Sequence, residues 1–177
     1  MKPPEILETE RLFLRAPLET DAHKIFDAYG QDHEVARYMT WRPNSNVGQI
    51  EQFIGEGIAA WKEEKRFPWT IVLKEKDQVI GMVELRPAGF KAEIGYVLAR
   101  PQWGRGIMTE AARCVVDWAL SQPEIYRVWA VCDVENVASA RVLEKAGMKR
   151  EGILRRYIIH PNLSDEPRDC YCYAAVK

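Results

Sequence analysis

The chain has 177 residues, 47% of them hydrophobic, which is enough for one well-filled core and short for two domains. We therefore expect a single domain over residues 1–177. The 25 basic and 26 acidic side chains give a formal charge of −1, so no overall field favours nucleic acid or a polyanionic partner. The first residues contain no apolar signal core, and no apolar run reaches the roughly 18 residues of a membrane span. The composition predicts a soluble, cytoplasmic protein with no nucleic-acid or membrane partner.

Cysteines and histidines do not fall at the spacings of a metal site or a disulfide scaffold. Only three histidines are present, and they are scattered along the chain. We expect reduced, mostly buried cysteines and no metal; the cysteines are Cys114, Cys132, Cys170 and Cys172.

Hydrophobic periodicity in the first half predicts strands and two amphipathic helices. One segment, Arg37–Asn46, is irregular and aromatic; it either borders a substrate cleft or packs its rings onto the core. The expected elements are a strand over Glu10–Ala16, a helix from about Asp21 to Gly30, a helix over Val47–Lys65, and a hairpin of strands Phe67–Lys74 and Val79–Arg86.

The second half predicts a strand, a glycine turn and a long helix, followed by a further strand, a short helix and a final pair of strands. The expected elements are a strand over Glu93–Ala99, a helix from about Met108 to Pro123, a strand over Arg127–Cys132, a helix over Asn136–Ala146, and strands over Lys149–Ile159 and Arg168–Val176.

The turn between the strand ending at Ala99 and the following helix carries Gly104 and Gly106. Glycine backbone can approach a ligand closely, and the unpaired amides at a helix start attract an anion. The turn is not a dinucleotide fingerprint, because Thr109 stands at the place of the third glycine, and no Lys-Ser or Lys-Thr pair makes it a Walker loop. It is either a phosphate-binding turn or a tight connection.

Two motifs in this order closely resemble the GNAT-type N-acetyltransferases, and within them the ribosomal-protein alanine acetyltransferase branch (RimJ/RimL-like). The motifs are Trp103–Ala111, WGRGIMTEA, and Glu135–Met148, ENVASARVLEKAGM. The opening Glu8–Arg15, ETERLFLR, and the ending segments Gly152–Arg155 and Asp169–Tyr173 match the same branch, so the resemblance spans nearly the whole chain.

The resemblance implies an α+β fold, an α/β three-layer sandwich. Its mixed, mostly antiparallel central sheet has about seven strands, with strands 4 and 5 splayed, and about four helices flank it. The splay admits the pantetheine arm of acetyl-CoA, the cosubstrate. By the resemblance, backbone groups of the fourth strand bind the pantetheine, the glycine turn binds the diphosphate, and the last helix lies by the thioester; the implied residues are Tyr96, Val97, Leu98, Trp103, Gly104, Arg105, Gly106, Ile107, Met108, Thr109, Asn136 and Ser139.

Two positions depart from the family pattern. Met108 replaces a small residue, which predicts a narrower approach to the turn. Leu143 replaces the tyrosine that protonates the departing thiolate in many members, and the branch suggests Ser139 as the substitute acid. Asn136 and Ser139 also fit simple helix-capping roles.

Direct attack of an amine on the thioester needs an oxyanion donor and a proton acceptor. The backbone N–H of Leu98 fits the first role by position, and Glu93 or Glu84 could act as base through water. A solvent-facing strand position is the alternative for both carboxylates. Strand alternation puts Glu93 on the face opposite Tyr96.

The sequence thus predicts an acetyl-CoA-dependent N-acetyltransferase that acetylates a primary amine directly, with a protein N-terminal amine as the first choice of acceptor. A small-molecule amine and a catalytically silent CoA-binding module are the alternatives. Either a monomer or a homodimer is compatible with the sequence.

Overall fold

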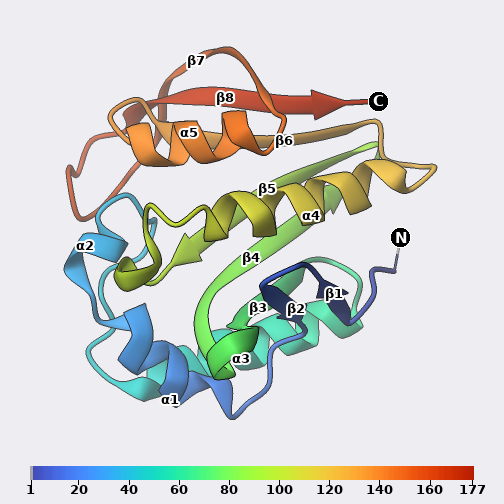
Figure 1. Cartoon of the computed structure of the whole chain (residues 1–177). Helices are drawn as coiled ribbons and strands as arrows, with labels where there is room; N and C mark the ends of the chain where they lie inside the picture. Colours follow the sequence, from blue (N-terminus) through green and yellow to red (C-terminus); the bar gives the residue numbers. More distant parts are fainter. Residues whose placement is uncertain (1) are drawn as a thin grey trace.

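A computed structural model describes residues 2–177, and Figure 1 shows its elements around one mixed sheet. Eight strands follow the order β1-β2-β3-β4-β5-β6-β8-β7. All neighbouring pairs are antiparallel except β5 and β6, which are parallel. The strands are β1 (Ile6–Glu8), β2 (Leu12–Arg15), β3 (Phe67–Leu73), β4 (Gln78–Ala88), β5 (Lys91–Leu98), β6 (Arg127–Asp133), β7 (Lys149–Ile158) and β8 (Arg168–Val176).

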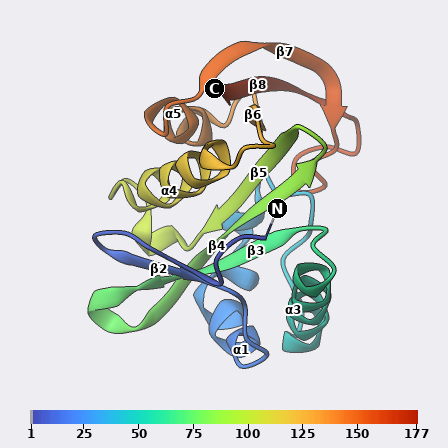
Figure 2. The same ribbon diagram turned by 90° about the vertical axis from the view of Figure 1, so that its right-hand side faces the viewer.

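Helices cover both faces of this sheet (Figures 1 and 2). One face packs on the long helix α4 and on α5 to form the main core, and the other packs on α1 and α3 to form a second, smaller core. None of the helices within residues 2–177 is long and apolar enough to cross a membrane. The helices are α1 (Asp21–Ile25), the π-helical turn Phe26–Gly30, α2 (His33–Ala36), α3 (Val47–Lys62), α4 (Ile107–Ser121) and α5 (Val137–Lys145), and short 3₁₀ turns span Lys74–Lys76 and Arg100–Gln102.

The predicted fold class is confirmed, with two additions. The sheet has eight strands where about seven were expected, because β1 is a three-residue strand with no periodic pattern of its own and forms by pairing with β2. A fifth α-helix, α2, is a single turn fixed by Asp32, whose carboxylate accepts hydrogen bonds from the amides of Glu34 and Val35.

The strands β5 and β6 pair over only three positions and then diverge. The pairs are Lys91 with Arg127, Ala92 with Val128, and Glu93 with Trp129; from Ile94 onward β5 pairs with β4 alone among the described residues. The two splayed strands expected as the fourth and fifth are therefore β5 and β6. An unpaired strand edge within a fold leaves backbone donors and acceptors without partners, so this edge can bind a ligand's polar groups.

Candidate active site

Six consecutive backbone amides of the glycine turn donate to no acceptor in the described part of the chain. Gly104 and Gly106 take left-handed backbone angles, with φ of +74° and +73°. Within residues 2–177, the N–H groups from Gly104 to Thr109 donate to no protein acceptor, whereas the N–H of Trp103 donates to the carbonyl of Arg100 at 3.1 Å. The last three of these amides open the first turn of α4, where the helix dipole is positive. The turn can therefore bind an anion through its main chain.

Side chains around the turn point away from it or hold it in place. The indole Nε1 of Trp103 donates to the carbonyl of Leu98 at 2.8 Å, and Arg105 donates to the side-chain oxygen of Gln102 at 2.7 Å. Met108 is only 4% exposed and packs in the main core. The expected narrowing of the approach by Met108 is therefore wrong, because its side chain fills the core beneath the helix.

Backbone groups of β5 face the open edge of the splay at alternate residues. The N–H of Ala99 donates to the carbonyl of Ile80 at 2.8 Å, which fixes the phase of the antiparallel ladder between β4 and β5. Opposed residues alternate between bonded and non-bonded pairs, so the backbone of Val97 bonds to β4, while the N–H and C=O groups of Tyr96 and Leu98 point away from β4. The C=O of Leu98 is already bonded to Trp103. The N–H of Leu98, the expected oxyanion donor, thus lies on the open edge.

A hydroxyl pair joins β5 to the start of α5. The hydroxyl of Tyr96 lies 2.8 Å from Oγ of Ser139, and the amide of Ser139 donates to the side-chain oxygen of Asn136 at 3.1 Å. The capping alternative for Asn136 is thereby confirmed. The hydroxyl of Ser139 does not cap the helix and instead contacts Tyr96. Leu143 is fully buried, and its aliphatic side chain has no proton to donate.

The phenol of Tyr96 is a candidate functional group that the sequence reasoning missed. Only its backbone was expected to contribute, because a tyrosine in a buried strand is ordinarily a core residue. Burial raises the pKa of Tyr96 above its usual value, and the hydrogen bond with Ser139 offsets this only in part. Burial likewise raises the pKa of the neighbouring Cys132 thiol to about 12. Both groups are therefore protonated at neutral pH.

A charged cluster, defined as Arg66, Glu84, Arg86 and Glu93, lies on the opposite face of β4 and β5. Glu84 is 6% exposed and accepts hydrogen bonds from Arg66 at 2.8 Å and from Arg86 at 2.5 Å. Arg86 also lies 3.5 Å from Glu93, whose side chain is 30% exposed. The solvent-facing alternative is wrong for Glu84, because two guanidinium groups compensate its buried charge.

Gly95 makes room for this cluster. A Cβ on Gly95 would lie 3.6–3.9 Å from the guanidinium atoms of Arg86, so Arg86 lies across the glycine. Of the two carboxylates proposed as bases, Glu93 is the more exposed and the more weakly bonded. It pairs in register with Trp129 at the closed end of the splay.

The irregular segment 37–46 is held against the loop that precedes β8. Asn162 donates to the carbonyls of Ala36 and Trp41 at 2.7 and 2.8 Å. The ring of Tyr38 meets that of His160 edge to face, with centroids 6.3 Å apart. Burial lowers the pKa of His160, although Asp133 opposes this shift from 3.7 Å. The ring of Tyr38 therefore packs onto neighbouring structure close to the end of β6.

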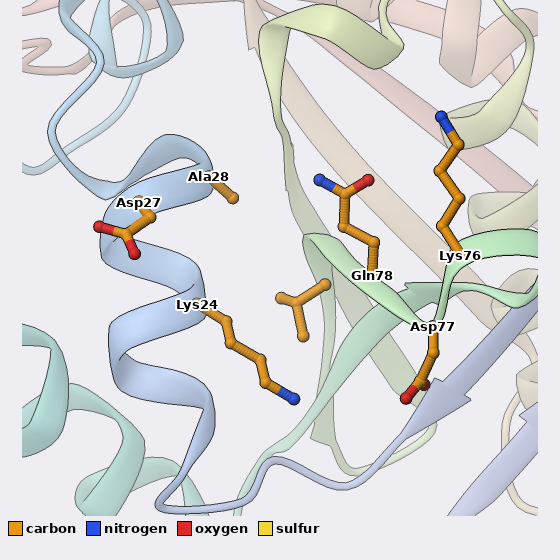
Figure 3. Close-up of a pocket in the computed structure, with 7 residues that line it drawn as sticks. Lys24, Asp27, Ala28, Lys76, Asp77 and Gln78 are labelled. Carbon is orange, nitrogen blue, oxygen red and sulfur yellow. The ribbon is translucent and has the colours of Figure 1, made fainter.

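A separate depression of about 390 Å³ lies between α1 and the β3–β4 hairpin (Figure 3). Lys24 and Asp27 project from the helical side, and Lys76 and Asp77 from the hairpin. Its charges balance, and it includes neither the glycine turn nor the splayed edge. No group of three or more histidine, cysteine or acidic side chains within residues 2–177 is arranged to hold a metal ion.

A mixed sheet that splays beside an anion-binding glycine turn is the arrangement of a GNAT acetyltransferase. The model of the acetyltransferase (GNAT) domain matches residues 11–149, and the chain belongs to this family. The expected class of enzyme and the expected cosubstrate are confirmed: it is an acetyl-CoA-dependent N-acetyltransferase.

One of the relatives of this chain is similar to it over nearly the full length of both proteins. The chain is 33% identical to the uncharacterized N-acetyltransferase YoaA of Bacillus subtilis (strain 168) over 175 residues, which cover 97% of each chain.

Two solved structures share the fold. The microcin C7 self-immunity acetyltransferase MccE, in complex with acetyl-CoA and AMP, has a TM-score of 0.87 at 23% identity and covers 99% of this chain and 98% of its own. RimL, a ribosomal L7/L12 α-N-protein acetyltransferase in complex with coenzyme A, has a TM-score of 0.86 at 20% identity and covers 97% and 98%.

Proposed function

We propose that this enzyme transfers the acetyl group of acetyl-CoA directly to the N-terminal amine of a protein. The observation that carries the cosubstrate part is the set of free amides from Gly104 to Thr109 beside the unpaired edge of β5. The acceptor part is supported by the RimJ/RimL-like motifs along the chain and by the common fold with RimL.

In the proposed reaction the amine nitrogen attacks the thioester carbonyl, and the carbon–sulfur bond then breaks. The N–H of Leu98 stabilises the oxyanion, as its position on the open edge of β5 allows. Glu93 takes, through water, the proton that the ammonium loses. Ser139 gives its proton to the departing thiolate and takes one from the hydroxyl of Tyr96, 2.8 Å away, and Tyr96 regains a proton from water when the products leave.

A small-molecule amine is the second candidate acceptor. MccE, with acetyl-CoA and AMP bound, has the same fold. The charged cluster has two cations and two anions, so its net charge favours neither a cationic peptide nor an anionic metabolite.

A panel of acceptors tests the proposal. Purified enzyme and acetyl-CoA are incubated with peptides bearing free N-terminal alanine, serine or methionine, with the same peptides acetylated at the N-terminus, and with small amines. Thiol release is measured and the products are analysed by mass spectrometry. We expect turnover on free peptide N-termini and none on the blocked peptides. Turnover confined to small amines would replace the protein acceptor, and absence of acetyl-CoA binding in calorimetry would contradict the cosubstrate site.

A further inference from the structure

The opening motif of the chain lies against the glycine turn, about one hundred positions away in sequence. Figure 2 shows the β1–β2 hairpin reaching the beginning of α4. Glu110, in the first turn of α4, accepts three hydrogen bonds from this hairpin: from the hydroxyl of Thr9 at 2.6 Å, from the amide of Arg11 at 2.9 Å and from Nε of Arg11 at 2.6 Å.

Arg11 also contacts the turn itself. Its Nη1 donates to the carbonyl of Arg105 at 3.0 Å, and its Nη2 lies 3.7 Å from where a Cβ on Gly106 would be. Its own backbone is held by the turn that follows β3, because the amide of Lys74 donates to the carbonyl of Arg11 at 3.0 Å. One planar guanidinium thus joins the sheet edge, the first turn of α4 and the peptide between the two glycines.

The charge of Glu110 makes this contact important for anion binding. Burial would raise the pKa of Glu110, but the hydrogen bonds from Thr9 and Arg11 outweigh it and lower the pKa. Glu110 is therefore a carboxylate on the residue directly after the last free amide, that of Thr109, and an unpaired carboxylate there would repel a diphosphate. Arg11 compensates this charge and leaves the positive helix end available.

We propose that Arg11 is a positioning residue for acetyl-CoA: it holds the glycine turn in the conformation that aims its amides at the diphosphate. The inference rests on the turn being the diphosphate site of the proposed function. Left-handed glycines have wide conformational freedom, so a turn with two of them needs an external tie to keep one shape. That external contact is the hydrogen bond from Arg11 to the carbonyl of Arg105.

The experiment compares Arg11→Gln, Arg11→Lys and the control Arg127→Gln. Arg127 forms a comparable Arg–Glu ion pair with Glu151, but it follows the other end of α4. Kd is measured by calorimetry for acetyl-CoA, and by competition for S-acetylpantetheine, which has the thioester arm and no diphosphate.

We expect Arg11→Gln to weaken acetyl-CoA binding about tenfold, the loss of one charge-assisted tie. S-acetylpantetheine binding should change less than about twofold, and Arg127→Gln should change neither ligand's Kd. Arg11→Lys should recover less than half of the loss on a logarithmic scale, because an ammonium keeps the charge and lacks the fork that reaches Glu110 and Arg105 together.

Three outcomes overturn the inference. An unchanged Kd for acetyl-CoA in Arg11→Gln shows that the tie is dispensable. Equal weakening of both ligands shows that Arg11 supports the slot or the fold in general. Full recovery in Arg11→Lys shows that charge alone matters. If the unaltered enzyme binds S-acetylpantetheine as tightly as acetyl-CoA, the turn is not the diphosphate site. The cosubstrate site given under the proposed function is then wrong, and the inference loses its premise.

Discussion

The two faces of β5 differ in whether their polar groups are paired with other groups of the protein. On the face toward α4 and α5, the strand leads from the hydroxyl of Tyr96 beside Ser139 to the glycine turn, whose amides from Gly104 to Thr109 have no protein partner within residues 2–177. On the other face, the carboxylates of Glu84 and Glu93 are bonded to arginines. Unpaired groups can bind a ligand, whereas paired groups mainly hold the fold. Substitutions on the first face should therefore change binding and catalysis, and substitutions on the second should change stability. Glu93 belongs to both groups, because it is paired with Arg86 and is also the proposed base.

The largest effect is expected on the first face. Ser139→Ala should lower kcat about 100-fold, the usual contribution of a positioned acid, with little change in KM for acetyl-CoA. Tyr96→Phe should lower kcat in the same direction by less, because Ser139 remains. Steady-state thiol release over a range of pH checks this, with Ser121→Ala at the end of α4 as the control. An unchanged rate at all pH values in Ser139→Ala would remove Ser139 as the acid.

On the second face, Glu84→Gln should lower the free energy of unfolding by about 2 kcal/mol, less than for a fully buried ion pair because both arginines are partly exposed. The acetyl-CoA Kd should stay within about twofold. Urea denaturation and calorimetry measure the two quantities. The matched control is Glu151→Gln, whose exposed pair with Arg127 should contribute little. A large loss of acetyl-CoA affinity with normal stability would reverse the assignment of the two faces.

Gly106→Val should raise the acetyl-CoA Kd about tenfold, because a side chain at φ of +73° is strained by roughly 1–2 kcal/mol and the turn must relax away from its binding shape. Gly55→Ala serves as the control: Gly55 is exposed within α3, and a Cβ there meets nothing within 4 Å. Calorimetry on both variants is decisive, and equal affinities would mean that the turn tolerates a different shape.

The smallest effect is a pH dependence at the turn. The pKa of Glu110 is lowered in the folded protein, so its contribution to stability is fully present above the ordinary glutamate pKa and is lost as the pH falls through the lowered value. The unaltered protein should lose slightly more stability than Glu110→Gln between about pH 5 and pH 3. Parallel urea titrations at each pH measure this difference, and identical pH profiles would show that the hairpin contacts do not favour the carboxylate.

Much of this architecture was predictable because it depends on local pattern. The alternation in β5, the left-handed glycines and the apolar stripe of α4 are properties of short segments, so the sequence predicted these elements, the turn and the faces of Glu93 and Tyr96. The class of fold followed from the family resemblance. The motifs predicted the family, which the match over residues 11–149 confirms. The binding and catalytic roles of individual residues stay predictions.

The tertiary structure decided which distant groups meet. Nothing in the spacing of Arg11 and Glu110, of Tyr96 and Ser139, or of Arg66 and Glu84 shows that they are in contact, because side chains far apart in sequence meet only once strands have been ordered in a sheet. The same holds for Met108, whose burial depends on how α4 lies on the sheet. Sequence by itself determined the backbone conformations that make a ligand site possible, since these arise from the local sterics of glycine and from hydrophobic periodicity. Only packing decided which charges are compensated and which amides remain free.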